Sequence, residues 1–325
     1  MIPENPMPAG EFMRRALHDP RHGYYARRIP GVGRRGDFTT APMLDATLAR
    51  AVAGWAAAAL RETGCRHLME IGPGEGVLAA AMWERLPWTL RWKTRLHLVE
   101  TSAPLREIQR QRLGRRASWH EHPSEALAGC GGGAVIFSNE LVDAFPARVF
   151  EKTAAGWREV AVAKDRCGRL TECLLEVGEL PQSSSFAIDH PVGQRVEIHE
   201  SYRKWLQSWL PLWRGGRMLT VDYGATAENL YHRRPRGTLR AYLMQQRLTG
   251  IEVYQNPGRQ DLTADVNFTD LLAWSGPWTR DERLAELGTF AREHGGHADA
   301  GIFTAPGGPG EAFLTLDQAC GGSGT

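Results

Sequence analysis

Residues 66–85, RHLMEIGPGEGVLAAAMWER, decide the fold class of this chain. They begin with an apolar run of strand length at 67–71, continue with glycines at 72, 74 and 76, and end with apolar residues at helical spacing. Strand, glycine turn and helix form the first unit of a nucleotide-binding βαβ fold, in which glycines let the backbone approach a ligand. The stretch predicts an open α/β sheet that binds a ligand beside this loop.

Two features of the loop favour a cationic ligand over a dinucleotide. The glycine spacing is GxGxG rather than GxGxxG, and Glu70 stands near the end of the strand just before the loop. A carboxylate there would repel a pyrophosphate but would suit an ammonium and a sulfonium. This chemistry points to S-adenosyl-L-methionine (SAM), held by Glu70, Gly72, Gly74 and Gly76. The alternative is that the loop is only a strand-to-helix turn.

Length and composition bound the class of protein. The chain has 325 residues, 42% of them apolar and 23% charged, with a net charge of +2, which is typical of a soluble globular protein with one elaborated core. No apolar run approaches the roughly 20 residues of a membrane helix. The first residues have no features of a targeting segment. We therefore expect no membrane partner and a cytoplasmic location for a bacterial-type protein.

Cysteine and histidine usage predicts neither disulfides nor a metal site. The five cysteines are odd in number and include no CxxC pair. The pairs His120 with His122 and His294 with His297 have no cysteine or carboxylate at ligand spacing, so surface positions are expected for them. Arginines clustered between positions 106 and 116 are interpreted as a solvated helix face rather than a nucleic-acid surface.

Patterning along the chain divides it into five parts. We expect an N-terminal helical extension with a loop at 1–64, a first part of the core at 65–146, an inserted antiparallel meander at 147–195, a second part of the core at 196–318 and a disordered tail at 319–325. Expected helices cover 44–60, 103–113, 196–213, 268–274 and 280–294. Expected core strands cover 67–71, 96–100, 134–137, 217–224 and 312–316.

Polar residues follow two further predicted strands. Glu100 ends the second strand at the position where nucleotide folds place an acid that holds ribose hydroxyls, and Thr101 stands beside it. Asn139 and Glu140 follow the strand at 134–137. Because ligands bind at the carboxyl ends of parallel strands, we expect these residues to lie near the cofactor.

Several motifs occur together in the order typical of one family. They are HDPRHGYY, GDFTTAP, EIGPGEGVL, LVETSAPLREIQ, SNELVDAFP, MLTVDYG, GTLRAY and DLTADVNF. From about Pro6 to Leu316 the chain resembles the MidA-type SAM-dependent methyltransferases, which include a mitochondrial complex I assembly methyltransferase linked to protein arginine methylation. The resemblance implies a class I methyltransferase: a Rossmann-like seven-stranded sheet with an inserted antiparallel β subdomain and an N-terminal extension. It also implies SAM as cofactor and S-adenosylhomocysteine (SAH) as product.

The resemblance assigns further roles. Asp37, Phe38 and Thr40 are expected in a lid over the cofactor, and Asn139 on its acceptor side. Glu140 and Asp143 are the candidate catalytic residues, because two carboxylates could pair with the guanidinium of an acceptor arginine. For Asp143 the alternative is a helix N-cap that satisfies free backbone N–H groups.

Four places depart from the family pattern. Ala41 replaces a usual Ser, Leu141-Val142 replaces an aromatic or hydrophobic pair, Asp265-Val266-Asn267-Phe268 replaces His-Val-Asp-Phe, and a His common near Gln245 is missing. These changes put the acceptor in doubt. The main hypothesis is methylation of a protein arginine, in assembly of respiratory NADH dehydrogenase. The alternatives are a SAM-binding assembly factor with little catalysis and a small-molecule methyltransferase. A monomer and a homodimer both remain open.

Overall fold

The computed structural model describes residues 5–26, 46–295 and 308–322. The chain forms two compact units, each assembled from three separate segments. Unit 1 comprises Met1–Phe38, Val142–Lys204 and Gly224–Leu271. Unit 2 comprises Thr39–Leu141, Trp205–Tyr223 and Leu272–Thr325.

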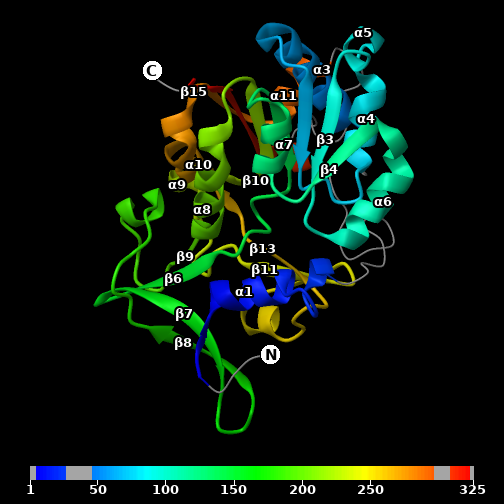
Figure 1. Cartoon of the computed structure of the whole chain (residues 1–325). Coiled ribbons are helices and arrows are strands. Elements are labelled where there is room, and N and C mark those ends of the chain that lie inside the picture. The colour runs from blue at the N-terminus through cyan, green and yellow to red at the C-terminus, as the bar shows by residue number, and fades with distance from the viewer. Residues whose placement is uncertain (1–4, 27–45, 296–307, 323–325) are drawn as a thin grey trace. The chain divides into compact units, whose positions relative to one another are not determined.

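Unit 2 is built on a mostly parallel sheet with the strand order β15-β16-β10-β5-β2-β3-β4 (Figure 1). Its strands are β2 (His67–Ile71), β3 (Arg95–Val99), β4 (Ala117–His120), β5 (Val135–Asn139), β10 (Arg217–Ala225), β15 (Thr279–Glu286) and β16 (Phe313–Cys320). Neighbouring strands from β4 to β10 run parallel, whereas β16 pairs antiparallel with both β10 and β15. This order confirms the predicted seven-stranded Rossmann-like sheet of a class I methyltransferase.

Helices cover both faces of this sheet. They are α3 (Ala46–Thr63), α4 (Val77–Arg85), α5 (Trp88–Arg91), α6 (Ala103–Leu113), α7 (Pro123–Gly129) and α11 (Leu287–His294). Apolar side chains of α3, α4 and α11 join those of β2, β3, β5 and β10 in one core, which includes Leu68, Leu96 and Leu98. Because side chains alternate along a strand, His67 and His97 point to the other face, where α7 contacts β3 and β4.

Unit 1 contains two smaller antiparallel sheets. The first has the order β1-β7-β6-β9, with β8 paired to β7, and the second has the order β12-β11-β13. Their strands are β1 (Met7–Pro8), β6 (Arg148–Thr153), β7 (Gly156–Lys164), β8 (Leu170–Leu175), β9 (Arg195–Ile198), β11 (Arg240–Leu243), β12 (Gln246–Leu248) and β13 (Asp261–Thr263). The predicted meander of three runs is confirmed as β6, β7 and β8. Further elements are α1 (Ala9–His18), α9 (Ala227–Leu230), β14 (Val266–Asn267) and α10 (Phe268–Ser275).

Three predicted segments are wrong. Residues 196–213 do not form one helix, because 195–198 pair with β6 as strand β9 and α8 covers only Glu200–Trp209. Residues 280–286 form β15 along β16, so a helix covers only the second half of 280–294. Residues 319–320 belong to β16 rather than to a disordered tail. In each case pairing with a neighbouring strand overrides the local pattern.

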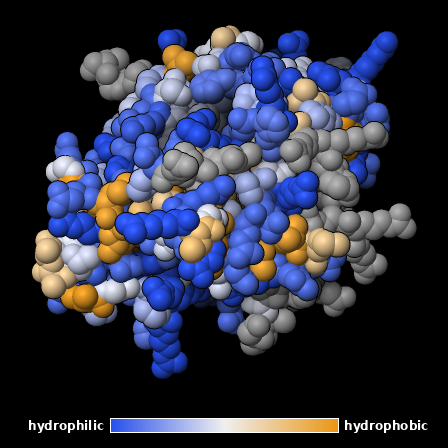
Figure 2. Space-filling model, turned by 90° about the horizontal axis from the view of Figure 1, so that it is seen from below, coloured by the Kyte–Doolittle hydropathy of each residue, from blue (hydrophilic) through white to orange (hydrophobic). Residues whose placement is uncertain are grey.

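The surface in Figure 2 is mainly hydrophilic, with hydrophobic side chains in small scattered groups among the coloured residues. No helix in the described part of the chain combines the length and apolar character that crossing a membrane requires.

Candidate functional site

The carboxyl ends of β2, β3, β5 and β10 meet at one edge of the sheet in unit 2. Ile71 is paired with Val99 and Ser138, and Asn139 with Val221. Adjacent parallel strands in this register end level with one another. The glycine loop, Glu100 and Glu140 therefore emerge from the same edge of the sheet, as predicted.

The glycine loop has a backbone shape that other residues would strain. Gly72, Gly74 and Gly76 have φ angles of +67°, +53° and +74°. A Cβ atom at Gly72 would lie 2.7 Å from Cδ1 of Leu141, whereas one at Gly74 would meet no atom within 4 Å. Gly76 is the N-cap of α4. The N–H of Gly72 donates to the carbonyl of Val99 at 3.0 Å and that of Gly76 to the carbonyl of Pro73 at 2.7 Å. The loop thus places main chain at the start of a helix, where a ligand can approach it closely.

Glu70 is a buried carboxylate at the end of β2, with 2% of its surface exposed. Burial and the nearby charge of Glu100 raise its pKa to about 8, although a hydrogen bond from the N–H of Ala79 partly offsets them. Its Oε2 atom has no hydrogen-bond partner among the described residues. A buried carboxylate oxygen of this kind suits a cationic ligand, which would supply the missing contact.

Glu100 follows β3 and is fixed by the backbone around it. Its N–H donates to the carbonyl of His120 at 2.9 Å, and its Oε1 accepts from the N–H of Ser102 at 2.8 Å. Burial raises the pKa of Glu100 to about 7, against the lowering effects of the Ser102 N–H and the Arg106 guanidinium. The next residue, Thr101, is exposed, and its carbonyl accepts from Arg106 at 3.3 Å.

Asn139 is the last residue of β5, and Glu140 follows it. The side-chain amide of Asn139 donates to Oε1 of Glu140 at 3.1 Å, and its own Oδ1 has no partner in the described part of the chain. Glu140 has a φ of +51°, and its N–H donates to the carbonyl of Val221 at 2.9 Å. A non-glycine residue in the left-handed region is uncommon, and such residues cluster at binding sites.

Gln109 is a site residue that the sequence analysis missed. Its Nε2 donates to the carbonyl of Gly74 at 2.6 Å, and its Oε1 accepts from the indole N–H of Trp119 at 3.0 Å. It is fully buried and also lowers the pKa of Glu100. Leu105, Gln109 and Leu113 share one face of α6. A polar residue within this apolar stripe is the sequence feature that could have indicated a role for Gln109.

Asp143 lies in unit 1 and does not cap a helix. The next regular element is strand β6, so the N-cap alternative is wrong. The Thr263 hydroxyl donates to its Oδ2 at 2.7 Å, and its main-chain carbonyl accepts from Ala264 at 3.2 Å. Burial raises the pKa of Asp143.

Asp261 is a second buried carboxylate of unit 1. The Tyr25 hydroxyl donates to its Oδ1 at 3.2 Å. Burial raises the pKa of Asp261 to about 7, and the charge of Asp143 raises it further. The charge of Arg240 lowers the pKa of both carboxylates, yet Asp143 still raises that of Asp261. A further cation from a ligand would therefore relieve the remaining repulsion.

Of three positions that depart from the family pattern, Asp265 and Asn267 have local partners. Asp265 forms ion pairs with Arg240 and Arg234. Asn267 precedes α10, and its Oδ1 accepts from the N–H groups of Thr269 and Asp270 at 3.0 and 3.3 Å. Gln245 lies in the exposed turn between β11 and β12 with a φ of +66°. Asp37, Phe38, Thr40 and Ala41 lie outside the described residues.

Histidines and one cysteine approach one another on the α7 face of the sheet, which corrects the expected surface position of His120. His120 is partly buried, and its Nε2 lies 3.0 Å from Nδ1 of His97. His97 in turn contacts His67 and Cys130. The four residues come from separate parts of the sequence, so spacing along the chain did not reveal the group.

The chain is similar to known methyltransferases in sequence. Residues 51–277 match the family model of S-adenosyl-L-methionine-dependent methyltransferases. The mitochondrial protein arginine methyltransferase NDUFAF7 homolog of Drosophila melanogaster is 28% identical over 82% of this chain and 66% of its own length. The mitochondrial protein arginine methyltransferase NDUFAF7 of Danio rerio is 27% identical over 90% of this chain and 75% of its own length.

One solved structure is similar along nearly the whole chain. A protein from Burkholderia thailandensis, crystallised with S-adenosyl-homocysteine bound, superposes with a TM-score of 0.82 at 25% identity. The match covers 98% of this chain and 89% of that one.

The names of the eukaryotic relatives contradict the cytoplasmic location expected from the sequence. Those relatives are mitochondrial proteins.

Proposed function

Because the chain belongs to the MidA-type family of SAM-dependent methyltransferases, we propose that it methylates an arginine side chain of a protein. SAM as cofactor and SAH as product are as predicted. When bound, SAM supplies a methyl group on a positively charged sulfur. The protein's main task is then to hold an attacking nitrogen in line with that methyl group.

The residues at the sheet edge of unit 2 fit the cofactor. We assign the ammonium group of SAM to Glu70, whose Oε2 lacks a partner among the described residues. We assign the methionyl part to the main chain at Gly72, Gly74 and Gly76. Glu100 and Thr101 are assigned to the ribose. Asn139 lies on the side of the reacting sulfur.

The acceptor assignment depends on one observation, the buried carboxylates Asp143 and Asp261 in unit 1. Their mutual repulsion raises the pKa of Asp261 beyond the effect of burial. A guanidinium presents five N–H donors in a planar fork that matches carboxylates. A protein arginine would therefore be a better ligand for this cluster than a neutral group.

Glu140 is the residue proposed to act on the attacking nitrogen. With SAM bound, a new N–C bond would form as the S–C bond breaks, the electron pair of that bond would remain on SAH, and the proton lost by the nitrogen would pass to the Glu140 carboxylate and then to water. A carboxylate hydrogen-bonded to the guanidinium keeps positive charge on the other nitrogens, which leaves electrons available on the attacking one. The names of the curated relatives support an arginine as acceptor.

Mass spectrometry tests the proposal directly. The protein is incubated with methyl-labelled SAM and cell extract, and labelled peptides are searched for methyl-arginine. We propose subunits of respiratory NADH dehydrogenase as the first acceptors to examine. Label found only on other side chains, or only on small molecules, would contradict an arginine acceptor.

Two variants test whether Glu140 and the cluster of Asp143 and Asp261 take part in methyl transfer. Asp143→Asn and Glu140→Gln keep the shape of each side chain and remove its charge. Both should lower methyl-arginine formation about 100-fold or more while SAH binding stays within a few-fold of the parent. Glu179→Gln, at an exposed position, is the control and should leave the rate unchanged. If Asp143→Asn retains full turnover, the cluster does not hold the acceptor.

A further inference from the structure

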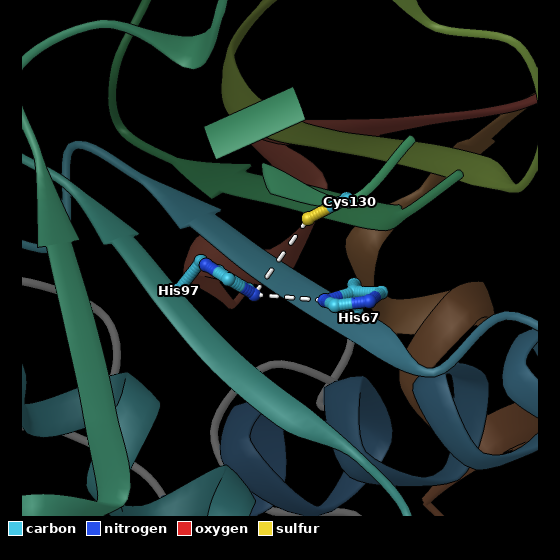
Figure 3. A group of neighbouring side chains, drawn as sticks. All are labelled: His67, His97 and Cys130. Atoms are coloured by element: carbon cyan, nitrogen blue, oxygen red, sulfur yellow. Dashed lines mark hydrogen bonds between the residues drawn. The ribbon is translucent and has the colours of Figure 1, made fainter. Parts of the chain in front are cut away.

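Three metal-ligand side chains converge on the α7 face of the sheet in unit 2 (Figure 3). His67 begins β2, His97 lies within β3, and Cys130 is the C-cap of α7. Nδ1 of His67 lies 3.0 Å from Nε2 of His97, and Sγ of Cys130 lies 3.7 Å from the same Nε2 atom. All three ligand atoms lie within 4.8 Å of one another.

We propose that His67, His97 and Cys130 form a binding site for a divalent zinc ion. Zinc in proteins takes nitrogen ligands at about 2.0–2.1 Å and thiolate sulfur at about 2.3 Å in a tetrahedral arrangement. That geometry places two nitrogens roughly 3.4 Å apart and a nitrogen and a sulfur roughly 3.6 Å apart. The two separations that involve Nε2 of His97 lie within a few tenths of an ångström of these values. The third pair, Nδ1 of His67 and Sγ of Cys130, lies within 4.8 Å, so rotation of the side chains can close the three groups around an ion.

The chemistry of the three groups selects zinc over magnesium or calcium. Two imidazoles and a thiol are borderline to soft ligands, whereas magnesium and calcium prefer oxygen. The three residues leave a fourth position, which a water molecule can occupy because His67 and Cys130 are both partly exposed. Partial exposure also gives the ion a route into the site.

His120 completes the site as a positioning residue. Nδ1 of His97 lies 3.0 Å from Nε2 of His120, so His97 can donate a proton there while its Nε2 lone pair faces the ion. Histidine ligands typically make such a hydrogen bond with their second nitrogen, and it fixes the ring orientation. The row His67–His97–His120 runs across three adjacent strands on one face of the sheet.

The electrostatic setting both favours and opposes an ion. Burial, with the neighbouring histidines and Arg95, lowers the pKa of His97 to about 4, so its imidazole is neutral and offers a lone pair. Burial raises the pKa of the Cys130 thiol to about 11, so a bound ion would have to displace the thiol proton. Arg95 adds unfavourable positive charge, which the resulting thiolate would offset.

The site lies away from the glycine loop, but His120 contacts the backbone of Glu100. His67 is the first residue of β2, and Gly72 follows the last, so the strand separates the two sites by roughly 16 Å at about 3.3 Å per residue. The carbonyl of His120 accepts the N–H of Glu100 at 2.9 Å. We therefore infer a structural zinc that joins β2, β3 and α7, and no part in methyl transfer.

Titration of the full chain tests this site without any activity assay. Protein stripped by a chelator is titrated with Zn²⁺ in competition with a chelating dye, and we expect one tightly bound equivalent. Cobalt(II) serves as a spectroscopic probe, and a thiolate-to-cobalt charge-transfer band with a tetrahedral visible spectrum is expected. No stoichiometric zinc and no such band would overturn the proposal.

Variants assign the ligands. Cys130→Ser should abolish the cobalt–thiolate band, and both Cys130→Ser and His67→Gln should weaken zinc binding at least 100-fold. His120→Gln should weaken it about 10- to 100-fold, as expected for the partner of a ligand. Cys173→Ser, at a partly buried cysteine of unit 1, is the control and should change neither quantity.

If Cys130→Ser fails to fold, the cobalt spectrum of the parent protein alone decides whether the thiolate binds the metal. Unchanged binding in folded Cys130→Ser and His67→Gln would place any zinc elsewhere and overturn the assignment.

Discussion

Asp265 of unit 1 and Glu70 of unit 2 are both buried carboxylates, but their charges are balanced differently. In unit 1, Asp265 pairs with Arg240 and Arg234, so its counter-ions belong to the protein. In unit 2, no arginine or lysine from the described part of the chain is among the groups that shift the pKa of Glu70, and burial raises that pKa to about 8. Burying a charge costs free energy unless a partner offsets it. Asp265 therefore has the features of a structural residue, and Glu70 those of a residue that a cationic ligand completes.

The largest expected effect is a loss of stability when Asp265 is replaced. Asp265→Ala leaves the guanidinium of Arg240 buried without its main partner. Breaking a buried ion pair from one side typically costs about 3–5 kcal/mol of unfolding free energy. Urea unfolding should show this loss, while SAH affinity of the folded protein should change little. Glu176→Ala removes an exposed partner of Arg158 and is the control. Equal losses in the two variants would show that Asp265 is not structural.

The next largest expected effect is weaker binding of SAH when Glu70 is replaced. Glu70→Gln should weaken SAH binding about 100-fold, because a charge-assisted contact to an ammonium contributes about 1.5–3 kcal/mol. The same change should not destabilise the protein alone at neutral pH, because Glu70 with a pKa of about 8 is mostly protonated there and Gln has nearly the same shape. Calorimetry and urea unfolding measure the two quantities. Glu84→Gln, at an exposed position of α4, should alter neither. A variant that binds like the parent would remove Glu70 from the cofactor site.

Glu100→Ala should have a smaller effect on the same binding measurement. The hydroxyls of a ribose are neutral, so a hydrogen bond from them to Glu100 contributes less than the contact between Glu70 and an ammonium group. Loss of about 1.5–2 kcal/mol corresponds to roughly 10- to 30-fold weaker SAH binding. Circular dichroism should show an unchanged fold. Undiminished affinity would mean that the ribose is held by other residues.

The parts of unit 2 nearest the glycine loop are those that the sequence predicts best. The loop glycines, Glu70 and the strand at 67–71 were predictable because one continuous stretch carries both the backbone signal and the charge. Strand β15 was predicted as a helix, since its pairing with β16 depends on residues about 30 positions away. Edge strands of this kind have weak local patterns, and neighbours distant in sequence decide their structure.

Residues that act through distant partners could not be predicted. Gln109 contacts Gly74 across 35 positions, and His67 meets His97 and Cys130 only because three elements fold together. Asp265 looked like a change at an acceptor site, yet Arg240 and Arg234 bind it. Sequence spacing reports neighbours on one helix or strand, whereas these contacts join different elements.

The smallest expected effect is the pH dependence of SAH binding, which sharpens the comparison for Glu70. Its pKa of about 8 in the folded protein exceeds the ordinary 4.5, so the folded state holds this proton more tightly than the unfolded state. The contribution to stability is therefore full below about pH 4.5 and is lost as the pH rises through 8. An ammonium ligand needs the carboxylate, so affinity should rise in the range where stability falls.

Between pH 7 and 8 the ionised fraction of a group with a pKa of about 8 rises about fivefold, and SAH affinity should rise by the same factor. Above pH 8 the gain should level off. Calorimetry in two buffers of different ionisation enthalpy should also detect a proton released on binding at pH 7. Glu70→Gln has no proton to release at this position, so its affinity should stay flat across the range. A parent protein with the same flat profile and no proton release would show that Glu70 is already ionised without the ligand, and the contrast between Glu70 and the ion-paired Asp265 would fail.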